Sequence, residues 1–178
     1  MKEMIMAIRR GDKGTPKRKD LAQRDIMLFL FGINTGLRVS DIIKLKVADV
    51  KGRRQMQVQE GKTRKKRLVN ILNIQRELDD YISGRDSQDY LFPSQKGKGP
   101  VTATQVYRML QDAGQWIGRD DIGTHTMRKT FGYHFYKQTK DVAMLQDIFN
   151  HSAPSITKRY IGITQDEIDE TLKGFRLG

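Results

Sequence analysis

The segment His125-Thr126-Met127-Arg128 holds the residue types most suited to chemistry on an anion. An i, i+3 spacing at the start of a helix puts His125 and Arg128 on one face, where both can donate hydrogen bonds to an anion. Taken alone, the pair is more typical of a histidine satisfied at a helix end and an arginine in a surface salt bridge. Its interpretation therefore depends on the rest of the chain.

Other kinds of catalytic site have little support in the sequence. The chain has 3 histidines and no cysteine, which excludes thiol catalysis, disulfide scaffolds and cysteine-based zinc sites. No two histidines have the short helical spacing of a hydrolytic zinc site. The segment GDKGTPK lacks the preceding strand and the Lys-Ser/Thr pair of a phosphate-binding loop. We therefore expect no cofactor, no metal and no nucleotide hydrolysis.

Positive charge is concentrated in two segments of this chain, whose formal net charge is +12. Residues 1–20 hold 7 basic and 3 acidic side chains, and residues 51–70 hold 8 basic and one acidic. Clustered positive charge is typical of proteins that bind a phosphate backbone, because each neutralised phosphate releases a counterion. An anionic membrane fits less well, since the basic stretch 62–67 lies between expected strands. A solvated basic surface is the remaining alternative.

Length and composition favour one compact cytoplasmic domain. A chain of 178 residues that is 37% hydrophobic can bury a continuous core. The longest apolar run, residues 26–31, is far shorter than the roughly 20 residues of a membrane span. Lys2 and Glu3 interrupt the amino terminus, which does not suggest secretion.

Apolar periodicity predicts a mainly α-helical fold with one small antiparallel β-sheet, an α+β class. Residues 21–33 should form a buried helix, capped by Asp20 and ended by Gly36. Ser40 should cap the helix that follows. Alternation between Val50 and Asn73 predicts a hairpin around the polar turn EGKTRKK, with room for a third strand.

Capping boxes mark the starts of two further helices. Thr102 pairs with Gln105, and Thr164 pairs with Glu167. Besides a short helix before residue 11 and the helix from Thr102 to Ile117, helices are expected at residues 74–83, 125–138, 141–149, 154–160 and 165–173. We expect His134 to lie in the core together with Phe131 and Phe135.

Five segments, taken in chain order, resemble the tyrosine recombinases, the phage-integrase and Xer-like family. They are a Thr-Gly-x-Arg box with a following acid, a lysine in the hairpin turn, a His-x-x-Arg box, a histidine after a helix end, and a tyrosine nine positions later. The matched residues are Thr35, Gly36, Arg38 and Asp41, then Lys62, His125 with Arg128, Phe149-Asn150-His151, and Tyr160. An ordered set of this kind is much more specific than any one motif.

The resemblance implies a tyrosine recombinase catalytic-domain fold over residues 20–165 and a phosphodiester as substrate. A metal-free enzyme needs fixed cations for the charge that develops on the non-bridging oxygens. Arg38 and Arg128 would supply planar forks that match phosphate. Lys62, on the hairpin, would be the general acid for the departing 5′ oxygen.

The resemblance also implies roles for two histidines and one tyrosine. His125 would accept a proton or orient the phosphate, and His151 would donate a hydrogen bond to it. Tyr160 would be the nucleophile and would hold the strand as a 3′-phosphotyrosine, so that no ATP is needed. Asn150 stands where the family usually has glycine, which fits a left-handed turn that asparagine tolerates.

Double-stranded DNA is the expected partner, and the protein is expected to be associated with the nucleoid. The residues expected to bind DNA outside the catalytic set are Lys17, Arg18, Lys19, Arg64, Lys65, Lys66 and Arg67. The family resemblance implies self-association on DNA as a cyclic tetramer, with synapsis of two sites.

The expected organisation is a single catalytic domain over residues 1–178. Residues 1–19 would form an amino-terminal helix and basic loop, and residues 165–178 a carboxy-terminal helix that docks on a neighbouring protomer. We expect the amino-terminal core-binding domain of the family to be absent, with the chain either a catalytic-domain fragment or a naturally minimal protein.

Two further functions stay open beside site-specific recombination or integration. One is a catalytically silent DNA-binding module that regulates recombination. An inactive site, however, would not require the six catalytic residue types that this chain has. The other is relaxation of DNA by the same phosphotyrosyl chemistry, as in type IB topoisomerases.

Overall fold

The computed structural model describes residues 1–10, 16–59, 61, 64, 66–162 and 172–176. The chain divides into two compact units, Met1–Arg128 and Lys129–Gly178. The expectation of a single domain stays a prediction. Within the described residues, no helix is long and apolar enough to cross a membrane.

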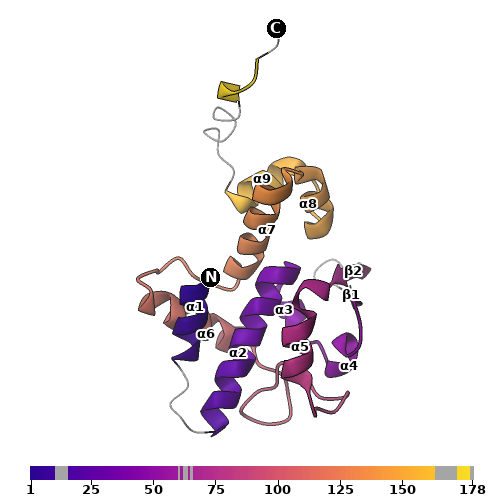
Figure 1. Cartoon of the computed structure of the whole chain (residues 1–178), viewed down its shortest axis with the longest axis vertical. Helices are drawn as coiled ribbons and strands as arrows, with labels where there is room; N and C mark the ends of the chain where they lie inside the picture. Colours follow the sequence, from indigo (N-terminus) through magenta and orange to yellow (C-terminus); the bar gives the residue numbers. More distant parts are fainter. Residues whose placement is uncertain (11–15, 60, 62–63, 65, 163–171, 177–178) are drawn as a thin grey trace. The chain divides into compact units, whose positions relative to one another are not determined.

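The first unit is built on α2 (Pro16–Thr35), against which α1 (Lys2–Arg9) and α5 (Gln75–Ile82) pack (Figure 1). Leu28 and Phe31 of α2 are completely buried. The prediction that Asp20 caps this helix is wrong, because α2 begins at Pro16 and Asp20 lies inside it. Proline suits a first helical turn, where its missing N–H has no helical partner to lose.

Two short helices, α3 (Val39–Ile42) and α4 (Val47–Val50), follow α2. The prediction that Ser40 caps the next helix is also wrong. Arg38 takes the extended cap conformation and Ser40 lies within α3, so the helix starts before the serine. Short helices leave local capping signals ambiguous by a residue or two.

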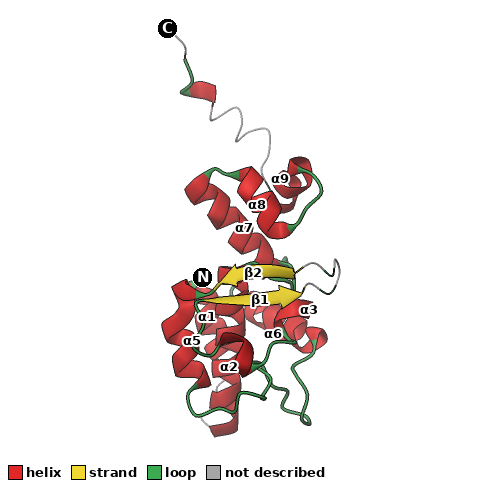
Figure 2. Ribbon diagram, turned by 90° about the vertical axis from the view of Figure 1, so that its right-hand side faces the viewer, coloured by secondary structure: helices red, strands yellow, loops and turns green. Residues whose placement is uncertain are grey.

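The expected hairpin is confirmed as β1 (Gln55–Gln59) paired antiparallel with β2 (Lys66–Asn70), as Figure 2 shows. Met56 lies opposite Val69, and both are buried. The glutamines of β1 alternate with these apolar residues and are exposed. No third strand extends this sheet among the described residues.

The 3-10 helix η1 (Leu72–Ile74) leads into α5, and α6 (Ala103–Trp116) comes later in the unit. The predicted capping box of α6 is confirmed. The Thr102 backbone N–H donates to Gln105 Oε1 at 2.9 Å, and the Gln105 N–H donates to Thr102 Oγ1 at 3.2 Å. The apolar residues Val106, Leu110 and Ala113 of this helix are buried, and Ile117 just after its end is half-buried.

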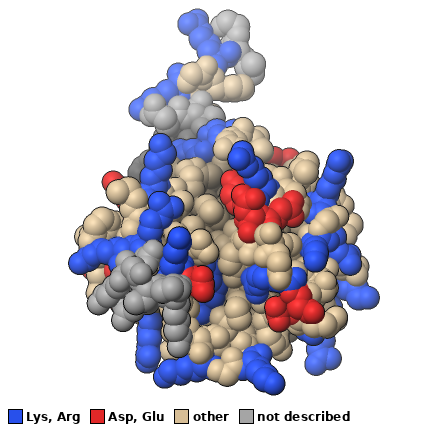
Figure 3. Space-filling view, turned by 60° about the horizontal axis from the view of Figure 1, so that its bottom comes forward, with Lys and Arg blue, Asp and Glu red and all other residues tan. Residues whose placement is uncertain are grey.

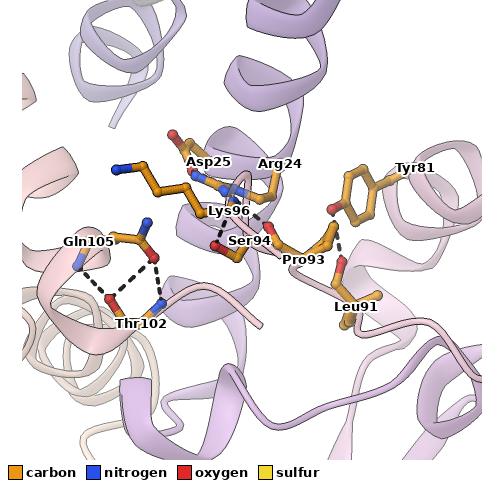
Figure 4. A network of polar contacts seen from close by, with 9 residues as sticks. All are labelled: Arg24, Asp25, Tyr81, Leu91, Pro93, Ser94, Lys96, Thr102 and Gln105. Atoms are coloured by element: carbon orange, nitrogen blue, oxygen red, sulfur yellow. Dashed lines mark hydrogen bonds and ion pairs between the residues drawn. The ribbon is translucent and has the colours of Figure 1, made fainter. Parts of the chain in front are cut away.

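A polar network ties α2 and α5 to the segment that follows α5 (Figure 4). Arg24 Nη1 donates to the Pro93 carbonyl at 2.9 Å, and its Nη2 lies 2.6 Å from Asp25 Oδ1. The Tyr81 hydroxyl donates to the Leu91 carbonyl at 2.8 Å. These bonds satisfy two carbonyls of an irregular segment that is not part of a helix or a sheet.

The second unit contains most of α7 (Thr126–Thr139), with α8 (Val142–Phe149) and α9 (Pro154–Ile161). Leu145, Phe149 and Ile161 form its buried centre. Gly132 of α7 permits this packing, since a Cβ there would lie 2.6 Å from Ile161 Cγ2 and 2.8 Å from the Phe149 ring.

The expectation for His134 is wrong. Its side chain is exposed on α7 and lies edge-on to Tyr133, with 5.4 Å between ring centroids. Phe131 and Phe135 are half-buried and pack on the centre of the second unit, whereas the histidine lies at the exposed edge of this apolar stripe. The helix expected at 165–173 lies outside the described residues, apart from its last two.

Candidate active site

The turn that carries Arg38 is fixed on both sides by the end of α2 and the start of α3. Thr35 Oγ1 donates to the Phe31 carbonyl at 2.7 Å. Gly36 then takes a left-handed φ of 62°, which ends the helix as predicted and which glycine adopts without strain. Leu37 is 1% exposed and anchors the turn in the core. Arg38 follows, half-buried and extended.

Arg128 bonds directly to that turn. Its side chain is 2% exposed, and Nη1 donates to the Gly36 carbonyl at 2.5 Å. A buried guanidinium has to engage its N–H groups, because an unpaired charge inside a protein is costly. Arg128 is therefore hydrogen-bonded to the backbone at a position two residues before Arg38, the other predicted arginine.

Met127 seats the His-x-x-Arg segment against α2. It is fully buried, and a Cβ on Gly32 would lie 2.5 Å from its Sδ atom. Gly32 thus leaves the room that Met127 occupies. Neither residue was predicted from the sequence, although a glycine inside a helical apolar run is a signal for close packing.

His125 stands in the turn before α7 and is exposed. The turn is closed by the Gly123 N–H, which donates to Thr126 Oγ1 at 2.8 Å. Because the helix starts after His125, the histidine is exposed in the preceding turn, whereas Arg128, in the first turn of α7, is buried.

The hairpin is held to α3 by a buried acid. Asp41 is 2% exposed, and its Oδ1 accepts the Gly61 N–H at 2.9 Å. Its Oδ2 is buried without a hydrogen-bond partner among the described residues. Lys62, the predicted general acid, lies outside the described residues. Gly61, the residue before it, is hydrogen-bonded to Asp41.

In the second unit, Asn150 brings His151 back from the end of α8. Asn150 has φ 53° and ψ 44°, the left-handed conformation expected for this departure from glycine. The His151 N–H then donates to the Gln146 carbonyl at 3.1 Å. His151 Nδ1 lies 3.0 Å from the hydroxyl of Thr157, which is completely buried. This pairing fixes the orientation of the imidazole.

Tyr160 lies in the last turn of α9 and is half-buried. Its ring is edge-on to that of His151, with 5.4 Å between centroids, and to that of Phe149 at 5.5 Å. The amine of Lys129 lies 5.9 Å from the Tyr160 ring centroid. A cation at this range favours negative charge on the ring, and the sequence analysis did not identify Lys129.

The predicted DNA-binding residues fall into two groups. Lys19 is exposed near the start of α2, whereas Arg64 and Lys66 are exposed on the hairpin. Since Arg38 follows the far end of α2, roughly 25 Å of helix separates Lys19 from the arginine turn. Lys65 and the side chains of Lys17 and Arg18 lie outside the described residues.

Arg67 differs from the other members of the hairpin group. It is half-buried, and its Nη2 donates to the Thr35 carbonyl at 2.9 Å. The described part of the chain contains no group of three or more His, Asp and Glu side chains that could hold a metal.

The sequence-family model described as the phage integrase family matches residues 4–167. The chain belongs to this family. The protein named "Probable integrase/recombinase YoeC" of Bacillus subtilis is 48% identical over 154 residues, which cover 86% of the chain and 85% of that protein. Tyrosine recombinase XerD of Corynebacterium glutamicum is 31% identical over 179 residues, which cover 96% of the chain and 57% of that recombinase.

Solved structures of this family have the same fold. The XerH recombinase, in a post-cleavage complex with its palindromic difH substrate, superposes with a TM-score of 0.75 at 19% identity, over 97% of the chain and 50% of XerH. The XerA recombinase gives a TM-score of 0.69 at 21% identity and covers all of the chain and 65% of XerA. The chain is thus a mainly helical tyrosine recombinase catalytic domain with a small antiparallel sheet, as predicted. It spans about half the length of most of these relatives.

Proposed function

We propose that this integrase-family chain cleaves and rejoins DNA strands at specific sites through Tyr160. The observation that carries the proposal is the bond from buried Arg128 to the Gly36 carbonyl. It brings the two arginines that the family order selects, from positions 90 residues apart, onto one turn. Two guanidinium groups at one turn can donate hydrogen bonds to the non-bridging oxygens of a phosphate, which gain negative charge in the transition state.

The reaction balances with the side chains of the chain alone. The Tyr160 oxygen attacks phosphorus and gives up its proton to His125 or to water. The bond from phosphorus to the 5′ oxygen breaks, and that oxygen takes a proton from Lys62. The strand is then held as a 3′-phosphotyrosine, whose bond energy permits rejoining when a 5′ hydroxyl attacks.

His151 and Thr157 would serve the same step. With Nδ1 turned to the Thr157 hydroxyl, Nε2 is the ring nitrogen that can donate to a phosphate oxygen. The edge of the same imidazole packs on the tyrosine ring. Because α9 carries both Thr157 and Tyr160, one helix orients the histidine and presents the nucleophile.

The proposed substrate is double-stranded DNA, bound through the exposed basic residues of the hairpin and through the catalytic arginines. The net charge of +12 supports this partner. Solved relatives include the Tn1549 transposon integrase with circular intermediate DNA. Lysine and arginine side chains are spread widely over the face in Figure 3, with smaller acidic groups among them, so charge alone does not define the footprint.

Assembly and location belong to the same proposal. On DNA we expect a cyclic tetramer in synapsis, with residues 165–178 docked on the neighbouring protomer, and a nucleoid-associated protein in the cell. A neighbour that supplies this segment would couple the activity of each protomer to assembly.

The test uses nicked duplexes that lose a short oligonucleotide on cleavage, which traps the covalent intermediate. Wild type should form a detergent-resistant protein–DNA adduct, and Tyr160→Phe should form none while binding DNA normally. Tyr136→Phe is the matched control, because Tyr136 is also half-buried and has the Lys140 amine 5.2 Å from its ring centroid. DNA binding by wild type without any adduct would support the silent binding module instead.

A further inference from the structure

The carboxy-terminal end of α2 receives two guanidinium groups. Arg128 Nη1 donates to the Gly36 carbonyl, and Arg67 Nη2 donates to the Thr35 carbonyl at 2.9 Å. The last carbonyls of a helix have no partner within it and carry partial negative charge. Neighbouring carbonyls of the turn that precedes Arg38 are thus bound from two different parts of the fold.

The strand register explains why Arg67 points to the helix. Successive side chains of a strand lie on opposite faces, and Arg67 shares its face with Val69, which is 3% exposed. Lys66 and Leu68 occupy the other face and are exposed. Arg67 lies opposite Val58 of β1, which is also buried. Its direction is therefore toward the core of the first unit, unlike that of Lys66.

Resting on the proposed function, we propose that Arg67 is a positioning residue that fixes the Arg38 turn to the hairpin. The hairpin bears Lys62, so the bond from Arg67 to Thr35 connects the segment of the general acid with the segment of the first arginine. Arg67 acts through Arg38, and its guanidinium is not the phosphate contact that its place in a basic run suggests.

Charge alone does not explain this choice of residue. A guanidinium is planar and offers several N–H donors in a fixed geometry, whereas a lysine amine is a point charge on a flexible stem. Lysine at this position retains the charge and can reach a carbonyl, but it holds the turn less rigidly.

The experiment compares Arg67→Ala with Lys66→Ala, its exposed neighbour on β2, which loses the same charge. Adduct formation is followed in single turnover at saturating DNA, and duplex binding is followed against salt. We expect Arg67→Ala to slow adduct formation at least about tenfold with the salt slope of wild type. Lys66→Ala should lower the slope by about 0.9 if it contacts one phosphate. Arg76→Ala, which removes the same charge as Arg67→Ala from an exposed position on α5, should keep the rate within about twofold.

Two further variants separate positioning from a general loss of structure. Arg67→Lys should recover part of the rate at an unchanged salt slope, and it replaces Arg67→Ala if that variant does not fold. The double variant of Arg38→Ala and Arg67→Ala should be no slower than Arg38→Ala alone, because Arg67 acts through Arg38.

Either of two results would overturn the inference. One is a salt slope lowered by Arg67→Ala with a normal rate at saturating DNA, which would make Arg67 a phosphate contact. The other is full additivity of the two substitutions. Failure of the proposed function looks different, because wild type itself would then form no adduct.

Discussion

His151 Nδ1 is paired with the hydroxyl of Thr157, on the helix of the proposed nucleophile. The oxygen lies 3.0 Å from Nδ1 and has no exposure to solvent. Thr157→Val keeps the shape of the side chain and removes the oxygen, which leaves the imidazole without its fixed orientation. We expect adduct formation to slow about tenfold, since a hydrogen bond of this kind contributes about 1 kcal/mol or more.

Thr157→Ser is the matched control for this prediction, because it retains the hydroxyl and loses only a methyl group. Its single-turnover rate should stay close to that of wild type. A valine variant as fast as the serine variant would show that the hydroxyl does not orient the histidine.

Much of the residue-scale picture follows from the sequence. The ordered boxes selected Arg38, Arg128, His151 and Tyr160, and the fold brings these together in two local pairs, one in each unit. The interpretation of Asn150 as a left-handed residue is confirmed. Arg67 was assigned with its basic neighbours, because residue type alone does not reveal which face of a strand a side chain occupies.

At the scale of elements, the contact between α2 and the start of α7 depends on the absence of a side chain at Gly32. A Cβ there would meet Met127 Sδ at 2.5 Å and Met127 Cβ at 3.0 Å. Gly32→Ala should therefore lower the free energy of unfolding by about 1–3 kcal/mol through overpacking. It should also slow adduct formation, since Arg128 follows Met127 directly. Denaturant unfolding and the single-turnover assay measure the two effects.

Gly99→Ala serves as the control, because a Cβ at Gly99 has no atom within 4 Å. It should unfold at the denaturant concentration of wild type. If Gly32→Ala were equally neutral, Met127 would have room to move and the proposed seating of Arg128 would be wrong.

Elements were predictable where a signal repeats over many residues. The helices from α5 to α9 and the hairpin occur where periodicity or a capping box indicated them. Helix starts at Asp20 and Ser40 were predicted wrongly, because a residue suited to cap a helix is also tolerated within its first turns. The contact of Met127, at the start of α7, with α2 had no sequence signal beyond Gly32, since contacts between distant segments depend on tertiary structure.

At the scale of the whole molecule, the pH dependence of stability carries a contribution from the network in Figure 4. Burial raises the pKa of Asp25 above its ordinary value of 3.8, although the charge and hydrogen bonds of Arg24 act against this. Above about pH 4 the folded protein thus keeps a proton that the unfolded chain has lost. As the pH rises above about 4, the contribution of Asp25 to the free energy of unfolding should therefore decrease.

Asp25→Asn removes this titration. As the pH rises from about 4, the free energy of unfolding of the variant should therefore increase relative to that of wild type. Thermal unfolding at several pH values measures the trend. Asp20→Asn, which changes an exposed carboxyl on the same helix, is the control. A difference that is independent of pH, or that shifts the other way, would contradict the raised pKa.

The chemical identity of the trapped linkage tests the central claim most directly. The covalent complex of wild type with a nicked duplex is digested with trypsin, and the DNA-bound peptide is identified by mass spectrometry. The account predicts one linkage, from the Tyr160 oxygen to a 3′ phosphate, in the peptide that begins after Arg159. A linkage to another residue, or to a 5′ phosphate, would contradict it.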